Sequence, residues 1–293
     1  MRLSRRGHAD WLGEASATLG GRVEKERRLP GLSAWGRVVD YRQQQVITDP
    51  RIALFRDSPL DAGTVLELGA ERVVLATGSH WRADGVGRRV LKPVPMAEGV
   101  EVLTPDHLMD GTLPTARSVI VYDDDHYYMA GVLAELLAVK GYAVTYVTPA
   151  ADASTWMHAT MEQHRVQARL IGLGVTIVPH RILVSVDTGG IMAVCAFTGR
   201  EHRIEGGALV SVTARLPRLD LWHALQACKA EWADAGIKSV TRIGDSLAPG
   251  TIAAAVFSGR RYAEELDAPP RSDGLPFRRE VTGLSDDYQI PGL

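Results

Sequence analysis

The feature that most constrains the fold is a strand–helix–strand run in the middle of the sequence. Residues 118–122 (SVIVY) are apolar and β-branched, residues 127–140 are rich in Ala and Leu and end at Gly141, and residues 143–148 are again β-branched. A buried strand, a glycine-terminated helix and a second buried strand together form a βαβ unit with parallel strands. The sequence therefore predicts an α/β protein.

The same alternation of strands and helices continues on both sides of this unit. Short strands separated by glycine-rich turns occupy residues 175–204 after a helix at 160–173, and this pattern indicates an antiparallel flap. The other predicted strands are 10–15, 52–56, 72–78, 208–213 and 239–243, and the last of these leads into an Ala-rich helix at 251–266.

Composition and charge exclude several classes of protein. A formal charge of -2 over 293 residues provides no basic surface for nucleic acid or anionic lipid. No apolar run approaches the roughly 20 residues that span a bilayer, and the N-terminus carries no apolar signal segment. Cys195 and Cys228 lack the spacing that holds zinc or an iron–sulfur cluster. We therefore expect a cytoplasmic protein with no nucleic-acid or membrane partner.

Three short motifs, in this order, are typical of flavoproteins with two dinucleotide-binding domains. Ala76-Thr77-Gly78 follows a predicted strand, residues 213–217 (TARLP) follow another, and Gly244-Asp245 precedes the Ala-rich helix. Gly78 can turn without a Cβ clash, and the Asp245 carboxylate can accept hydrogen bonds from ribityl or ribose hydroxyls. The alternative for Asp245 is an ordinary cap on the helix that follows.

A second group of predicted nucleotide-binding residues lies near the N-terminus. Glu14 ends the first predicted strand, where an acid commonly bonds adenosine ribose hydroxyls, although a surface acid is the simpler interpretation. Gly20-Gly21-Arg22 forms a tight turn whose arginine can contact the nucleotide. Trp81 is the one tryptophan close enough to a predicted motif to stack on an adenine or flavin ring.

Several longer segments make the sequence resemble the trimethylamine and histamine dehydrogenase family, over about residues 7–284. In that family a barrel with FMN and an iron–sulfur cluster oxidises the amine, and the electrons pass to a separate acceptor. The family's C-terminal domains are similar to glutathione reductase and hold an ADP, and the family implies a homodimer. The segments are ATLGGRV (17–23), LPGLSAWGRVVDYR (29–42), VVLATGSHWRADG (73–85), VYDDDHYYMAGVLAELL (121–137) and RIGDSLAPGTIAAAVFSGRR (242–261).

The resemblance implies two Rossmann-like, glutathione-reductase-like domains. The first, similar to FAD- and ADP-binding domains, is split into residues 7–81 and 236–268. The second, similar to NAD(P)-binding domains, is inserted at residues 115–235. Residues 82–114 are expected to be a linker, and residues 269–293 an extended tail.

The sequence departs from the family in ways that affect its expected function. It lacks a counterpart of the barrel, and no GxGxxG phosphate loop or first strand precedes Glu14. We therefore expect no catalytic residue, no FMN or iron–sulfur cluster, and only weak binding of ADP or FAD. The chain is then a nucleotide-binding fragment or degraded copy, with a barrel-bearing chain as the partner that supplies the strand. The alternatives are a stand-alone FAD/NAD(P)H-dependent oxidoreductase and a non-enzymatic partner subunit.

The acidic run Asp123-Asp124-Asp125-His126 is the most conspicuous polar segment. A metal site is one interpretation, but consecutive residues rarely converge on one ion, so capping of the following helix is favoured. The run stands where a phosphate loop would require glycines, and we expect no NAD(P)H binding there. His158, Glu162 and His164 are interpreted as exposed polar residues of a helix.

Overall fold

A five-stranded parallel sheet forms the best-buried part of the protein. The computed structural model describes residues 2–268, and in it this sheet has the strand order β5–β12–β6–β7–β8. Its two central neighbours, β6 and β12, are buried almost throughout, because apolar side chains point to both faces. The strands are β5 (Glu101–Leu103), β6 (Ser118–Asp123), β7 (Ala143–Val147), β8 (Thr176–Val178) and β12 (Ala208–Val212).

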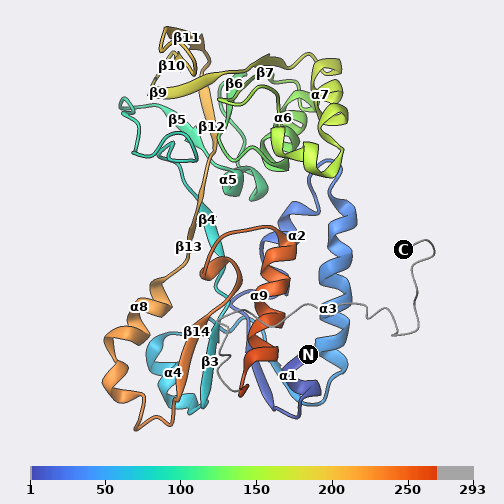
Figure 1. Ribbon diagram of the computed structural model, residues 1–293, viewed down its shortest axis with the longest axis vertical. Coiled ribbons are helices and arrows are strands. Elements are labelled where there is room, and N and C mark those ends of the chain that lie inside the picture. The colour runs from blue at the N-terminus through green and yellow to red at the C-terminus, as the bar shows by residue number, and fades with distance from the viewer. Residues whose placement is uncertain (1, 269–293) are drawn as a thin grey trace, which may run out of the picture.

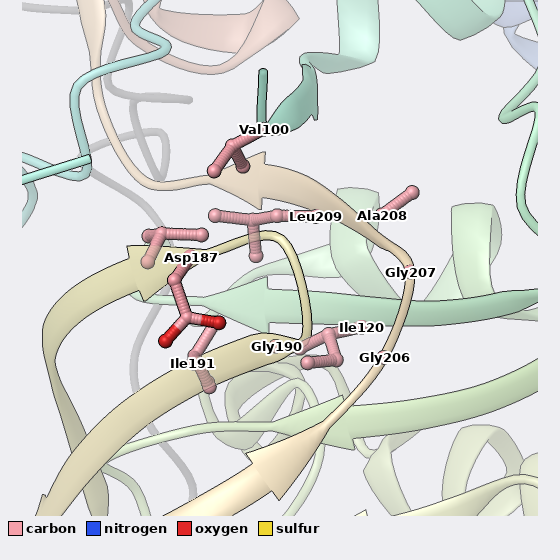
Figure 2. A pocket seen from close by; sticks show the side chains of 10 residues that line it. Val100, Ile120, Asp187, Gly190, Ile191, Gly206, Gly207, Ala208 and Leu209 are labelled. Atoms are coloured by element: carbon pink, nitrogen blue, oxygen red, sulfur yellow. The ribbon is translucent and has the colours of Figure 1, made fainter. Parts of the chain in front are cut away.

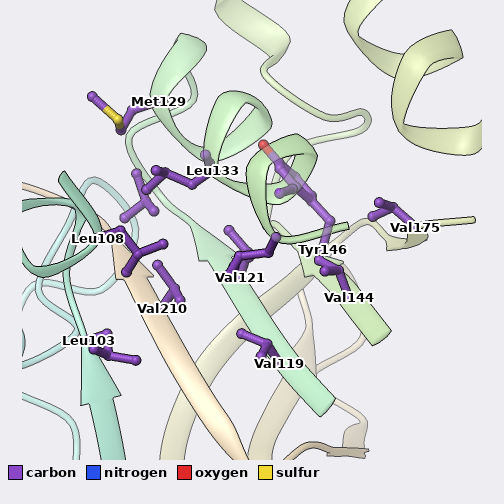
Figure 3. Packing of buried hydrophobic residues seen from close by; sticks show 14 of the residues in the cluster. Leu103, Leu108, Val119, Val121, Met129, Leu133, Val144, Tyr146, Val175 and Val210 are labelled. Carbon is purple, nitrogen blue, oxygen red and sulfur yellow. The ribbon is translucent and has the colours of Figure 1, made fainter. Parts of the chain in front are cut away.

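Helices cover one face of this sheet and close its main core (Figure 3). Met129 and Leu133 of α6 (Tyr128–Val139) are fully buried against the sheet together with Val121 of β6. At about 25 cal/mol per Å² of apolar surface removed from water, a run of such side chains is a main stabilising term. The other covering helices are α5 (Pro105–Met109) and α7 (Gln163–Gly172).

The predicted antiparallel flap is present on the other face. It consists of β9 (Arg181–Asp187), β10 (Gly190–Cys195) and β11 (Glu201–Glu205), in the order β11–β10–β9. The first strand assigned to it from the sequence, at 175–179, instead pairs with β7 of the parallel sheet as β8. Buried apolar side chains join the flap to the sheet, among them Tyr122, Leu183, Ile191 and Leu209.

The other half of the molecule contains two separate pairs of parallel strands. β1 (Asp10–Gly13) pairs with β2 (Ile52–Phe55), and β3 (Arg72–Leu75) pairs with β14 (Ser239–Arg242). These pairs are much less buried than β6 and β12. The helices around them are α1 (Arg2–Arg5), α2 (Arg22–Glu26), α3 (Gly36–Thr48), α4 (Ala62–Leu68), α8 (Asp220–Ala227) and α9 (Ile252–Glu265).

Two crossing segments connect the halves at a waist, beside α2 and one end of α3 (Figure 1), and Leu29 and Leu32 after α2 pack into the core of the five-stranded half. β4 (Ser79–Trp81) runs toward the five-stranded sheet and β13 (Arg215–Pro217) returns from it, and the two pair antiparallel. A two-stranded ribbon has few side chains to pack against, so the contacts beside it determine how firmly the halves are joined. Short 3₁₀ helices occupy Ser33–Trp35 (η1), Thr155–Thr160 (η2), Lys229–Glu231 (η3) and Gly244–Ser246 (η4).

The segment 82–114, expected to be a linker, contains β5 and α5, and β5 pairs with β12 of the parallel sheet. The sequence analysis also did not identify α3 and α8. The predicted tail, 269–293, lies outside the described residues. None of the helices in residues 2–268 combines the length and the apolar character needed to cross a bilayer.

Candidate functional site

Predicted residues from distant parts of the chain meet around the Asp245 carboxylate, beside the waist. Its Oδ2 accepts hydrogen bonds from Ser79 Oγ at 2.8 Å and from Arg215 Nη1 at 2.7 Å. Arg22 Nη1 lies 3.2 Å from the same oxygen. Oδ1 accepts the N–H of Gly250 at 3.0 Å. One carboxylate therefore connects the segments that follow β1, β3 and β14 with β13.

These contacts exclude the helix-cap interpretation of Asp245 and leave its nucleotide-binding role a prediction. The side chain is 13% exposed, and both of its oxygens are bonded within the chain. It does not cap the following helix, because Thr251 Oγ1 accepts the N–H of Ala254 at 3.2 Å and is the N-cap of α9. The helix-cap interpretation is therefore wrong. Asp245 organises the site, with two arginines as counterions.

Glu26 joins this network to the other half of the molecule. Its side chain is completely buried, its Oε1 lies 2.8 Å from Arg22 Nε, and its Oε2 accepts a hydrogen bond from the Tyr128 hydroxyl at 3.0 Å. Burial raises the pKa of Glu26, while the nearby Arg22 opposes that shift. Tyr128 begins α6, so this hydrogen bond ties α2 to the five-stranded half.

Glycines determine the local backbone of the site. Gly20 has φ +116°, and a Cβ there would lie 2.7 Å from Val39, so only glycine fits. Gly21 has φ +52° and Gly78 has φ +78°, and neither has a heavy atom within 4 Å of the place where a Cβ would be. The backbone at these two positions is therefore open to the close approach of a ligand.

Trp81 is buried beneath Arg215, whose guanidinium carbon lies 5.3 Å from the ring centroid. Its indole Nε1–H is buried without a hydrogen-bond partner. The backbone N–H of Trp81 donates to the Asp106 carboxylate at 2.8 Å. Trp81 therefore lies beside the Asp245 network and faces Arg215, one of its two arginines.

Glu14 and the 76–77 segment lie at the rim of the site, outside the Asp245 network. Glu14 follows β1, is partly exposed, and its Oε1 accepts the N–H and hydroxyl of Ser16 at 2.9 and 2.8 Å. Ala76 and Thr77 are exposed, and Thr77 Oγ1 donates to the Arg218 carbonyl at 2.7 Å. Gly244 has φ +59°, and its N–H donates to Ser258 Oγ at 2.9 Å.

Among the members of the site that the sequence analysis missed are Glu26, Tyr128 and Arg215. Arg215 lies in the TARLP segment, whose order along the chain was noted without a role for its arginine. Glu26 and Tyr128 are 102 positions apart, so no local pattern signals that they meet.

The acidic run closes the carboxyl end of β6. The N–H groups of Asp124 and Asp125 both donate to the Val212 carbonyl, at 2.9 and 3.2 Å. Asp124 Oδ2 accepts the N–H of Arg89 at 2.9 Å and that of Val90 at 3.3 Å. The position where a dinucleotide-binding sheet holds a pyrophosphate is thus filled by the chain itself.

The predicted cap on α6 is wrong in its details. The N-cap position is Tyr127, and no side chain bonds the first amides of the helix. Asp123 Oδ1 instead accepts the His126 N–H at 2.8 Å, and its other oxygen accepts a hydrogen bond from the Tyr146 hydroxyl. Within the described residues, no three potential ligands are grouped to hold a metal ion.

Two other polar or hollow features have ordinary explanations. His158 lies in η2, is exposed, and pairs with Asp152 at 2.7 Å. A shallow depression between the flap and the parallel sheet is lined by glycines and apolar side chains (Figure 2). Asp187, its one charged lining residue, is paired with Arg203. Neither feature presents a free reactive group.

Comparison with known proteins shows which proteins this chain is similar to. Residues 103–223 match the OYE-like second alpha/beta domain. Dimethylamine dehydrogenase from Hyphomicrobium sp. (strain x) is 31% identical over 312 residues, which cover 98% of this chain and 42% of that protein. Histamine dehydrogenase from Rhizobium sp. 4-9 has a TM-score of 0.91 and 48% identity, covering 97% of this chain and 44% of the other. The chain is homologous to dimethylamine and histamine dehydrogenases.

A third relative is also similar to this chain over less than half of its own length. The 6-hydroxypseudooxynicotine amine oxidase from Pseudomonas geniculata N1 has a TM-score of 0.84 and 41% identity, covering 91% of this chain and 40% of the other. The chain spans about two fifths of the length of each of these relatives. These relationships show what the chain is homologous to, and they leave the activity and substrate of this chain open.

Asp125 provides a test of the closed acidic loop. Burial raises its pKa from 3.8 to about 6, and the nearby Asp123 adds to the shift while Arg88 opposes it. Because the folded state favours the protonated carboxyl group, Asp125 contributes most to the free energy of unfolding below its unfolded pKa. This contribution is lost as pH rises through about 6. We expect Asp125→Asn to increase the free energy of unfolding at pH 8, by up to about 3 kcal/mol, and to change it little at pH 4.

Urea denaturation at both pH values measures this difference. Asp234→Asn is the matched control, because Asp234 is exposed and its replacement should change stability equally at both pH values. A stabilisation by Asp125→Asn that is as large at pH 4 as at pH 8 contradicts the account.

Proposed function

We propose that this chain is the adenine-nucleotide-binding module of an amine-dehydrogenase-like flavin oxidoreductase. The observation that carries the proposal is the convergence of Arg22, Trp81 and Asp245 at the carboxyl ends of parallel strands. In open α/β sheets, nucleotides bind beyond those ends. The homology to dimethylamine and histamine dehydrogenases supports the oxidoreductase assignment.

The residues present fit the adenosine diphosphate part of a dinucleotide. Glu14 has a partly exposed carboxylate beyond β1 that can accept ribose hydroxyls. The open backbone at Gly21 and Gly78 allows phosphates to approach main-chain amides. Arg22 brings a guanidinium to the same turn. We assign ADP as the ligand in preference to complete FAD, because the family's C-terminal domains, which the chain resembles, hold an ADP.

Within this proposal the two halves of the molecule are both Rossmann-like, and they have different roles. The half with β1 and β3 holds the nucleotide, and the five-stranded half supports it through the hydrogen bond between Tyr128 and Glu26. The family resemblance assigns FMN and the iron–sulfur cluster to a barrel outside this chain. Our proposal therefore assigns binding and no redox step to the residues described here.

Calorimetric titration with ADP tests the nucleotide site. We expect saturable binding with a dissociation constant of about 0.1 mM or weaker, because only two glycines of the site, Gly21 and Gly78, leave the backbone open to the phosphates. Glu14→Ala should weaken binding at least about tenfold, which corresponds to the loss of a charge-assisted hydrogen bond. Glu67→Ala, which removes an exposed acid on α4, should leave binding unchanged. Micromolar binding, or equal binding by wild type and Glu14→Ala, contradicts the proposal.

The five-stranded half should not bind NADPH. Asp124 and Asp125 stand where the pyrophosphate would lie, and like charges roughly 4 Å apart cost about 4 kcal/mol at an effective dielectric constant near 20. We expect NADPH to give no saturation by fluorescence titration up to about 1 mM, equivalent to binding weaker than about -4 kcal/mol. If the wild-type chain binds NADPH near micromolar concentration and Asp124→Gly binds it equally, the closed-loop argument is wrong.

A further inference from the structure

All three nitrogen atoms of the Arg22 guanidinium are engaged within the chain. Nε lies 2.8 Å from Glu26 Oε1, Nη1 lies 3.2 Å from Asp245 Oδ2, and Nη2 donates to the Gly250 carbonyl at 3.5 Å. The Arg22 side chain is 19% exposed, so a ligand can reach its edge. A phosphate bound there competes with the Glu26 and Asp245 carboxylates for the same N–H groups.

The two carboxylates differ in what else holds them. Asp245 keeps its ion pair with Arg215 and two further hydrogen bonds when Arg22 turns away. Glu26 keeps the hydrogen bond from the Tyr128 hydroxyl, and within residues 2–268 Arg22 is the one cation paired with it. Because the Glu26 side chain is completely buried, water does not replace the lost counterion. A buried carboxylate in this position takes up a proton.

The groups that face Glu26 from neighbouring elements favour the same outcome. Burial raises the pKa of its carboxyl, and the negative charges of Asp245 in η4 and Asp106 in α5 add to that shift. Arg22 on the same helix and the Tyr128 hydroxyl on α6 oppose the rise in pKa. A phosphate brings more negative charge to Arg22, so it acts in the same direction as Asp245 and Asp106.

The other elements that pack against α2 leave this balance unchanged. In α3, the Asp40 carboxylate pairs with Arg27, which follows α2. In η1, Trp35 contacts the Tyr128 ring edge to face, with 4.5 Å between the ring centroids, and it carries no charge. Within the described residues, Arg22 is therefore the counterion on which the charge of Glu26 depends.

We propose that ADP binding at Arg22 places a proton on Glu26, so that Glu26 couples the nucleotide site to pH. This inference rests on the proposed function and adds its regulation. In the free chain Glu26 is a carboxylate paired with Arg22. In the complex the N–H groups of Arg22 turn to the phosphates, and a proton taken from the solvent converts Glu26 to the neutral acid. Glu26 is therefore a positioning residue, which acts on ADP through Arg22.

Uptake of a proton together with ADP fixes the direction of the pH dependence. The complex holds more protons than the free chain, so the affinity for ADP falls as pH rises. The second ionisation of a phosphate ester occurs at about pH 6, so ADP changes its own charge little above pH 7. Between pH 7 and 9 we expect the dissociation constant of the wild-type chain to rise by up to about tenfold per pH unit, and that of Glu26→Gln to stay within about twofold.

Calorimetric titration of the full chain with ADP at pH 7.5, in buffers with different enthalpies of ionisation, counts the protons taken up. We expect at least about half a proton per ADP for the wild-type chain and about none for Glu26→Gln, whose amide does not ionise. Glu24→Gln is the matched control, because Glu24 is an acid of the same helix that pairs with Arg27. It should take up as many protons as the wild-type chain.

The carbon-13 NMR signal of the Glu26 carboxyl group tests the same claim in the wild-type chain, without a variant that has to fold. At pH 7.5 saturating ADP should move this signal to the position of the protonated acid, whereas the free chain should show the carboxylate. ADP binding without proton uptake, or uptake that persists in Glu26→Gln, overturns this inference and leaves the nucleotide site in place. If ADP does not bind, the proposed function and this inference fail together.

Discussion

The arrangement of the half that contains β1 and β3 depends on the ion pairs that Arg22 and Arg215 make with Asp245. Their side chains are 19%, 12% and 13% exposed, so the three charges are largely withdrawn from water. Breaking such a set by removing one member is expected to cost about 3–5 kcal/mol, because the remaining charges lose their counterion. Asp245 therefore determines where the turn after β1, the ribbon at the waist and the start of α9 lie relative to one another.

The two halves of the molecule bury their strands to different extents, and this difference follows from their connections. In the five-stranded half every central strand has a neighbour on both sides, so apolar residues such as Val121 and Val210 are completely buried. In the other half the strands form two separate pairs. Side-chain ion pairs, rather than backbone hydrogen bonds, hold these two pairs next to each other. The buried Glu26 and its hydrogen bond from Tyr128 link the well-packed half to the less packed one.

Local patterns in the sequence predicted the fold well where burial alone determines structure. The apolar run at 118–122 identifies β6, because a strand covered on both faces is apolar throughout and can be recognised from its own residues. β5 has only three residues, and it is a strand because it pairs with β12. No local pattern marks so short a strand, so the segment 82–114 was predicted to be a linker. Arg22 and Asp245 were predicted separately from turn motifs, whereas the contact between them and the participation of Arg215 arise from tertiary structure.

The central claim is that an adenine nucleotide binds at the carboxyl ends of β1 and β3 and that the acidic loop after β6 excludes one from the five-stranded half. A crystal structure of the chain with saturating ADP tests the location directly. The account predicts density for the ribose beside Glu14 and for the phosphates beside Arg22 and the amide of Gly21. Density for ADP beside Asp124 and Asp125, or an ordered ADP that contacts neither Glu14 nor Arg22, would contradict it.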